Sequence, residues 1–148
     1  IHRVIALPEI RAKLAEQATL QVHRLSLVDA VEGYGAYQPR QETKFRPGDQ
    51  VTLYAEIENF SSESTEGGYR TRLATSYEVV DKNGKRVDSA EFPEVEDLCR
   101  TVRRDFHMQY TVTLPTRIYP DAYEIRLTVT DQQSAKIGQA SVPLEIID

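Results

Sequence analysis

Apolar and polar residues alternate along most of the chain after residue 20, and this alternation restricts the possible fold more than any other feature. In the run 51–57 the odd positions are apolar, and the even ones are polar or amphipathic, so that Glu56, like Glu58 just after the run, is expected to face solvent. The same pattern recurs in later runs, at 69–79, 106–114 and 123–129. Because successive side chains of a β-strand point to opposite faces, each run predicts a strand with one buried side.

Turn-forming residues divide the chain into about seven such strands. Asn83-Gly84 favours a type I′ hairpin turn, in which both central residues have positive φ angles. Pro143 places the last strand at a sheet edge, because proline cannot donate a ladder hydrogen bond. The tract 61–68 is rich in turn formers, has no hydrophobic anchor and predicts a mobile loop. The predicted strands span residues 20–31, 50–60, 69–81, 85–92, 103–114, 122–130 and 137–147.

Strands of this number and spacing predict an all-β fold, an antiparallel β-sandwich formed by residues 20–148. Residues 1–19 form a separate N-terminal segment, in which Pro8 and the apolar residues that follow indicate a short helix or an extended stretch. We expect strands 50–60 and 69–81 to lie in different sheets. The alternative is that the two strands form a hairpin.

That hairpin has specific support in the sequence. If the residue numbers of the two strands sum to 128, Glu58 faces Arg70 and Glu56 faces Arg72, which gives two favourable cross-strand pairs. Backbone hydrogen bonds between 56–58 and 70–72 would therefore establish the hairpin and exclude the sandwich crossing.

A family resemblance rests on the segment 118–127, in which a proline, two further residues and Tyr123 open the penultimate strand. This spacing resembles the tyrosine corner of immunoglobulin-like and fibronectin type III domains, and the resemblance covers about residues 20–147. It implies that the Tyr123 hydroxyl binds the backbone of the loop 115–121. The segments 45–54 and 123–131 also resemble uncharacterised envelope-associated sandwich domains of bacteria. Such a resemblance implies a fold and no activity.

The charge balance argues against some classes of partner. With 18 basic and 23 acidic residues the net charge is −5, whereas nucleic-acid binding depends on basic side chains that neutralise phosphates. No apolar run approaches the ~18 residues of a membrane-spanning helix. The chain begins at Ile1 with no signal-like stretch, and we expect it to be part of a longer protein.

Few residues suggest chemistry. Cys99 and His107 are a conceivable nucleophile and base, but neither lies in a recognised motif. The three histidines lack zinc-site spacing, and we expect no metal, cofactor or catalytic residue.

Two interpretations of the acidic loops stay open. The carboxylates either bind Ca²⁺ or form a solvated surface balanced by Arg100, Arg103 and Arg104, and the residues concerned are Glu94, Glu96, Asp97 and Asp131.

Tyrosines provide the best candidate binding site. If the strands alternate up and down, Tyr34, Tyr37 and Tyr119 meet at one end of the sandwich, together with Phe45. Tyrosine rings stack on sugars or fill the pocket of a protein partner. The alternative is that these rings close the end of the core and bind nothing.

The sequence therefore predicts a non-catalytic module of a larger exported or envelope protein, acting as a spacer or as a protein-interaction surface. The second hypothesis is a carbohydrate-binding module that uses the tyrosine-rich end. The partner is accordingly a protein or a glycan, and the expected location is extracytoplasmic.

Overall fold

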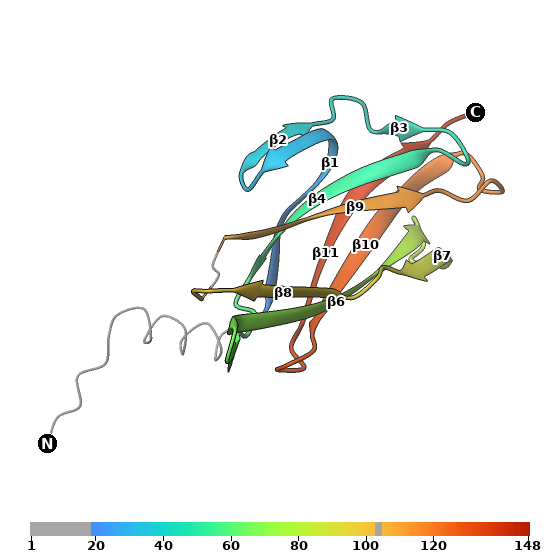
Figure 1. The fold of residues 1–148 in the computed structure, drawn as a ribbon. Coiled ribbons are helices and arrows are strands. Elements are labelled where there is room, and N and C mark those ends of the chain that lie inside the picture. The colour runs from blue at the N-terminus through green and yellow to red at the C-terminus, as the bar shows by residue number, and fades with distance from the viewer. Residues whose placement is uncertain (1–18, 103–104) are drawn as a thin grey trace, which may run out of the picture.

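Strands account for nearly all of the regular structure in the computed structural model, which describes residues 19–102 and 105–148. The short helix expected near Pro8 lies outside these residues. Within them, no helix is long and apolar enough to cross a membrane. The described chain forms an all-β sandwich (Figure 1).

Eleven strands build the sandwich, and they include all seven that the sequence predicts. Their bounds are β1 Gln21–Gly33, β2 Ala36–Pro39, β3 Lys44–Phe45, β4 Gln50–Glu58, β5 Glu63–Thr65, β6 Gly68–Asp81, β7 Arg86–Glu91, β8 Val95–Cys99, β9 Phe106–Thr113, β10 Asp121–Asp131 and β11 Ile137–Ile146. The four strands that the sequence analysis did not predict are short, namely β2, β3, β5 and β8.

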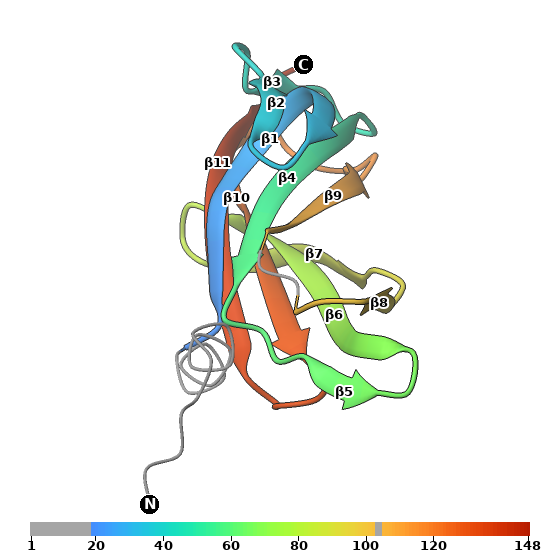
Figure 2. The same cartoon turned by 60° about the vertical axis from the view of Figure 1, so that its left-hand side comes forward.

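Two sheets face each other across the core (Figure 2). The four-stranded sheet has the order β2-β1-β4-β9, and the seven-stranded sheet has the order β3-β11-β10-β6-β5, with β7 and β8 also paired to β6. Neighbouring strands are antiparallel except for β3 and β11, which run parallel. Since β4 and β6 belong to different sheets, the predicted crossing is confirmed and the hairpin alternative is wrong.

The tract 61–68 forms part of the seven-stranded sheet, so the prediction of an unstructured mobile loop was wrong. Residues Glu63–Thr65 form β5 and pair with the start of β6, where Glu63 lies opposite Arg70. The two side chains form an ion pair with an N–O distance of 3.0 Å. Polar turn formers can therefore build a short edge strand when a longer neighbour supplies the hydrogen-bonding partner.

The β6–β7 connection is a hairpin, as Asn83-Gly84 predicts, but its turn type differs from the expected one. Gly84 has a φ of +81°, whereas Asn83 is not among the described residues with positive φ. The Asp81 carboxylate instead accepts hydrogen bonds from the backbone N–H groups of Asn83 and Lys85. A type I′ turn requires positive φ at both central residues, so the carboxylate-bonded loop replaces it.

The core forms from the inward faces of the long central strands. It contains alternate residues of β4, β6, β9 and β10, and its most buried members include Val51, Leu53, Ile57, Val79, Val112, Ile125, Leu127 and Val129. Apolar alternation therefore identified the inner face of each long strand correctly. The outer face of β4 does not follow the same rule, as described below.

Tyr123 occupies the position that the tyrosine-corner spacing implies. Its ring is buried, and its hydroxyl donates a hydrogen bond of 2.6 Å to the carbonyl oxygen of Tyr119. Burial raises the pKa of the Tyr123 phenol, so the hydroxyl keeps its proton at neutral pH. The bond fixes the loop before β10 to the strand itself.

We expect Tyr123→Phe to lower the free energy of unfolding by about 1–3 kcal/mol, because the Tyr119 carbonyl loses its partner inside a packed corner. Chemical denaturation of both proteins measures the change. Tyr119→Phe is the matched control, since the Tyr119 side chain is exposed and only its backbone takes part in the bond. Equal stability of Tyr123→Phe and the wild type would contradict the structural role of this hydroxyl.

Candidate interaction surface on the outer face of β4

The β1–β2 hairpin covers the outer face of β4, and a bulge in β1 makes this possible. His23 pairs with Glu56 but Ser26 pairs with Tyr54, so the register shifts by one residue across Arg24 and Leu25. Arg24 has a φ of +50°, which is uncommon for a residue other than glycine. Bulges bend the strand that contains them. After Leu27, β1 pairs with β2 rather than with β4.

A hydrogen bond fixes the tip of this hairpin to the sheet. The turn consists of Tyr34 and Gly35, and Gly35 has a φ of +72°. The Gly35 N–H donates to the hydroxyl oxygen of Tyr54 at 2.8 Å. Glycine adopts positive φ without steric cost, so this turn can follow the curve of β1 back to β4.

The carboxylate of Glu56 is buried below the tip, although the alternation of the sequence predicts that it faces solvent. Glu56 is only 2% exposed, although it points away from the main core. It accepts a hydrogen bond of 2.6 Å from the Tyr54 hydroxyl and a second, of 3.3 Å, from Arg24 Nη1. The prediction that Glu56 faces solvent was wrong, because the hairpin covers this part of the outer face.

Four aromatic rings extend from this network to the surface. Tyr37 stacks on the fully buried Tyr54 with ring centroids 4.1 Å apart, and Tyr54 stacks on His107 at 5.7 Å. Tyr34 lies tilted against His107 at 6.4 Å and is 39% exposed. The rings thus form a continuous series from a buried support to a partly exposed tip.

Two tyrosines of this network, Tyr54 and Tyr34, stay protonated at neutral pH. Burial, followed by the hydrogen bond to Glu56, raises the pKa of Tyr54 to about 12. Burial and the negative charges of Glu56, Asp105 and Glu58 raise the pKa of Tyr34. The Tyr54 hydroxyl therefore acts as a donor to the Glu56 carboxylate.

The structure brings two of the three predicted site tyrosines together and leaves the third apart. Tyr34 and Tyr37 belong to the hairpin, whereas Tyr119 is 85% exposed in the β9–β10 connection, which Figure 1 shows on the opposite side of the molecule from the hairpin tip. Phe45 lies in the core. The up-and-down strand count fails because β1 bends across a face of the sandwich and does not end at its rim.

We define the hairpin surface as Tyr34, His107 and Arg24. Arg24 is mostly exposed while its guanidinium reaches the buried Glu56. At its border, His23 Nε2 lies 3.2 Å from an oxygen of Glu58. Sequence reasoning missed His107 and Arg24 here, because neither lies near the tyrosines along the chain. The surface combines an aromatic ring held from below with the cationic Arg24, and the acidic Glu58 lies at its border.

Three of the acidic residues considered for Ca²⁺, namely Glu94, Glu96 and Asp131, contact other groups of the protein. Glu94 pairs with Arg72 at 2.9 Å and Glu96 with Arg70 at 3.7 Å. In the described part of the chain, no group of three or more His, Cys, Asp or Glu side chains is placed to hold a metal ion. Cys99 is half-buried on β8 in the seven-stranded sheet, whereas the ring of His107 contacts tyrosines on the other sheet.

Asp131 has a structural role at one end of the sandwich. It is fully buried, and its carboxylate accepts hydrogen bonds from Ser61 N–H at 2.6 Å and from Ser61 Oγ at 3.1 Å. The N–H groups of Gln133 and Ser134 bind the same carboxylate. Asp131 therefore joins the end of β10 to the segment that follows β4 in the other sheet.

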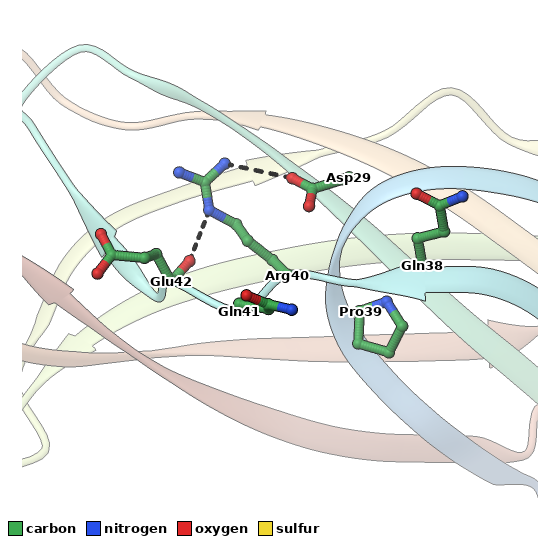
Figure 3. Close-up of a pocket in the computed structure, with 6 residues that line it drawn as sticks. All are labelled: Asp29, Gln38, Pro39, Arg40, Gln41 and Glu42. Atoms are coloured by element: carbon green, nitrogen blue, oxygen red, sulfur yellow. Dashed lines mark hydrogen bonds and ion pairs between the residues drawn. The ribbon is translucent and has the colours of Figure 1, made fainter.

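A depression lies between β1, the end of β2 and the segment that follows β2. Figure 3 shows the Arg40 guanidinium crossing it, with Nε donating to the carbonyl oxygen of Glu42 at 2.6 Å and Nη1 3.9 Å from Asp29. Five of the six lining residues are exposed, namely Asp29, Gln38, Pro39, Gln41 and Glu42. Ligand pockets are mostly apolar and enclosed, and this one is polar and open.

Comparison with known proteins shows the fold alone. No protein-family model matches the chain, and no curated protein sequence matches it significantly. The alkylpurine DNA glycosylase AlkC of Pseudomonas fluorescens is similar in structure, with a TM-score of 0.50 and 12% identity over 94% of this chain and 36% of that chain. A family 123 glycoside hydrolase from Clostridium perfringens gives a TM-score of 0.54 and 11% identity over 88% of this chain and 28% of that chain.

An immunoglobulin-like protein of Pseudomonas aeruginosa is 20% identical over 88% of this chain and 98% of its own, with a TM-score of 0.42. This chain spans only about a third of the length of the DNA glycosylase and of the glycoside hydrolase. It shares with them an all-β sandwich.

Proposed function

We propose that this chain is a non-catalytic interaction module of a larger exported or envelope protein, and that it binds a protein partner through the hairpin surface. One observation carries the proposal: the partly exposed Tyr34 ring rests on His107, which in turn stacks on the buried Tyr54. The finer assignment to immunoglobulin-like domains belongs to the same proposal. The Tyr123 hydroxyl bond to the preceding loop supports it.

The energetics of protein interfaces favour this surface. Binding energy concentrates in a few residues, among which Tyr and Arg are enriched. An aromatic ring that is already held in place loses little conformational entropy on binding. Arg24 hydrogen-bonds to the buried Glu56 and the Tyr34 ring packs against His107, so a partner would meet an aromatic ring and a cation that both already have contacts within the domain.

Two alanine variants distinguish the exposed end of the ring series from its support. We expect Tyr37→Ala to lower the free energy of unfolding by about 1–3 kcal/mol, because it removes a ring stacked on Tyr54. Tyr34→Ala should change it by less than about 0.5 kcal/mol, since that ring is partly exposed. Chemical denaturation measures both changes. Comparable destabilisation by the two variants would show that the Tyr34 ring contributes to the packing of the fold and would contradict its role as a binding residue.

Binding itself is tested by crosslinking in the cells that produce the full-length protein. A photoreactive benzophenone side chain replaces Tyr34 in one variant and Val87, an exposed residue of β7, in the control. We expect a defined protein adduct at position 34 and none at position 87. Equal labelling at both positions would contradict the proposed surface. If the protein instead gives a glycan-array signal that Tyr34→Ala abolishes, the partner of this surface is a carbohydrate and not a protein.

A further inference from the structure

The four-stranded sheet ends at β9, whose second edge is open. All eight residues of β9 pair in regular antiparallel register with β4, from Gln50 opposite Thr113 to Ile57 opposite Phe106. No described strand pairs with the other side of β9, which forms the rim of the sheet in Figures 1 and 2. The unpaired edge is therefore as long and as regular as the paired one.

β9 lacks the features that protect strand edges against pairing with another chain. Its sequence, FHMQYTVT, contains no Lys, Arg, Asp, Glu, Pro or Gly, and its ladder with β4 contains no bulge. The outer strands elsewhere have such features. β2 and β5 have four and three residues, β2 ends in Pro39, and β7 and β8 contain several charged residues. Among the described strands, β9 thus offers an unprotected edge.

The backbone groups on this edge can be identified from the register. Leu114 N–H donates to the carbonyl oxygen of Asp49, which continues the β4–β9 ladder by one pair. In an antiparallel ladder every second residue directs both its N–H and its C=O toward the same neighbour. The even-numbered residues of β9 therefore bond to β4, and the groups of the odd-numbered residues point to the open edge. These residues are His107, Gln109, Thr111 and Thr113.

We propose that β9 pairs with β9 of a second copy of this chain, in antiparallel orientation about a two-fold axis at Tyr110. Residue numbers of opposed positions then sum to 220, so that His107 faces Thr113 and Gln109 faces Thr111 of the other copy. All outward N–H and C=O groups of the four odd-numbered residues find partners in this register. The two four-stranded sheets become one continuous sheet. The proposal goes beyond the hairpin surface: the two share His107, but the β9 pairing needs neither Tyr34 nor Arg24.

The chemistry of the strand favours a second copy as the occupant. Opposed side chains on the outer face are polar hydrogen-bonding groups, namely Gln109 with Thr111 and His107 with Thr113. On the inner face Met108 meets Val112, and Tyr110 meets its own copy, so apolar residues oppose apolar residues. Like charges directly opposite each other would destabilise such a pair, and β9 contains none. The edge is thus compatible with a second copy of itself, because polar side chains oppose polar ones, apolar side chains oppose apolar ones, and no Lys, Arg, Asp or Glu is present.

Two charge variants test both the dimer and its register. Gln109 and Thr111 are exposed on the outer face, so substitutions there leave the core unchanged. The double variant Gln109→Lys, Thr111→Lys places Lys opposite Lys at two positions of the dimer. The matched variant Gln109→Lys, Thr111→Glu places Lys opposite Glu at the same positions. Sedimentation velocity at concentrations up to about 100 μM measures the oligomeric state of the full chain.

We expect the wild type and the Lys/Glu variant to sediment as dimers and the Lys/Lys variant as a monomer, with all three folded by circular dichroism. A monomeric wild type would overturn the proposal. If the axis instead passed through Gln109, the lysines introduced by Gln109→Lys in the two copies would oppose each other in both variants. Dissociation of the Lys/Glu variant would therefore overturn the proposed register. Tyr34→Ala should remain dimeric, so failure of the hairpin surface and failure of this interface give different results.

Discussion

Replacing Asp131 with Ala is expected to lower the free energy of unfolding by about 3–5 kcal/mol. The carboxylate is fully buried and accepts hydrogen bonds from Ser61, Gln133 and Ser134. Its removal leaves several N–H donors without their acceptor in a part-buried region, and it separates the end of β10 from the segment after β4. Urea denaturation followed by far-UV circular dichroism measures the loss.

A control in the same strand separates this effect from the loss of one negative charge. Glu124 lies on the exposed face of β10, and Glu124→Ala should change the free energy of unfolding by less than about 0.5 kcal/mol. Asp131→Asn keeps one carbonyl oxygen and should fall between the wild type and Asp131→Ala. Equal stability of the Asp131 and Glu124 alanine variants would show that the hydrogen bonds of this carboxylate contribute nothing.

Truncation of Tyr54 is expected to have an effect of similar size. Tyr54→Ala removes a fully buried ring that stacks between Tyr37 and His107, which should cost about 3–5 kcal/mol. Tyr54→Phe retains the ring but leaves Gly35 N–H without its acceptor and removes one of the two donors to Glu56, and should cost about 1–3 kcal/mol. The same urea titration measures both variants.

The local consequence of the Tyr54 variants distinguishes this network from the main core. In both variants the β1–β2 hairpin loses its attachment to the sheet, so amide hydrogen exchange should accelerate at residues 33–39 before it does in β10. Thr52→Ala is the matched control, because Thr52 lies on the same face of β4 and takes no part in the network. Uniform acceleration over the whole sandwich would contradict a separate outer-face cluster.

Regular alternation explains why most of the long strands were predictable, and the Asn83-Gly84 turn signal indicated β7. The apolar positions of β4 and β10 repeat every two residues, and in both strands these residues line the core. The short strands β3 and β5 contain two and three residues, which is too few to show a period. Their pairing depends on long neighbours, so no local pattern indicates it.

The outer-face network illustrates a second limit. A polar residue at an even position of β4 indicates the outer face, but it does not indicate whether another segment covers that face. The hairpin covers Glu56 only because β1 shifts register at Arg24. One signal was present in the sequence: Leu27 and Val28 are consecutive apolar residues, both are buried, and they interrupt the alternation where β1 leaves β4.

Tyr123 shows the opposite case, in which a short motif predicted an atomic contact. Its hydroxyl was expected to bind backbone within 115–121 and binds Tyr119. The motif succeeds because donor and acceptor are four residues apart, so the local chain geometry determines the contact. The prediction that Tyr119 lies beside Tyr34 failed because the two residues belong to different connections, and their positions depend on how the strands between them are arranged.

The parallel pairing of β3 with β11 affects the order in which the protein can form during synthesis. It joins Lys44–Phe45 to Glu145–Ile146, segments that lie roughly a hundred residues apart in the chain. Nearly all of the residues shown here must therefore emerge from the ribosome before this pair can form. Until then β10 has only β6 beside it, and one side of the nascent seven-stranded sheet stays open. Closure of the sandwich is thus a late event that waits for the last strand to emerge.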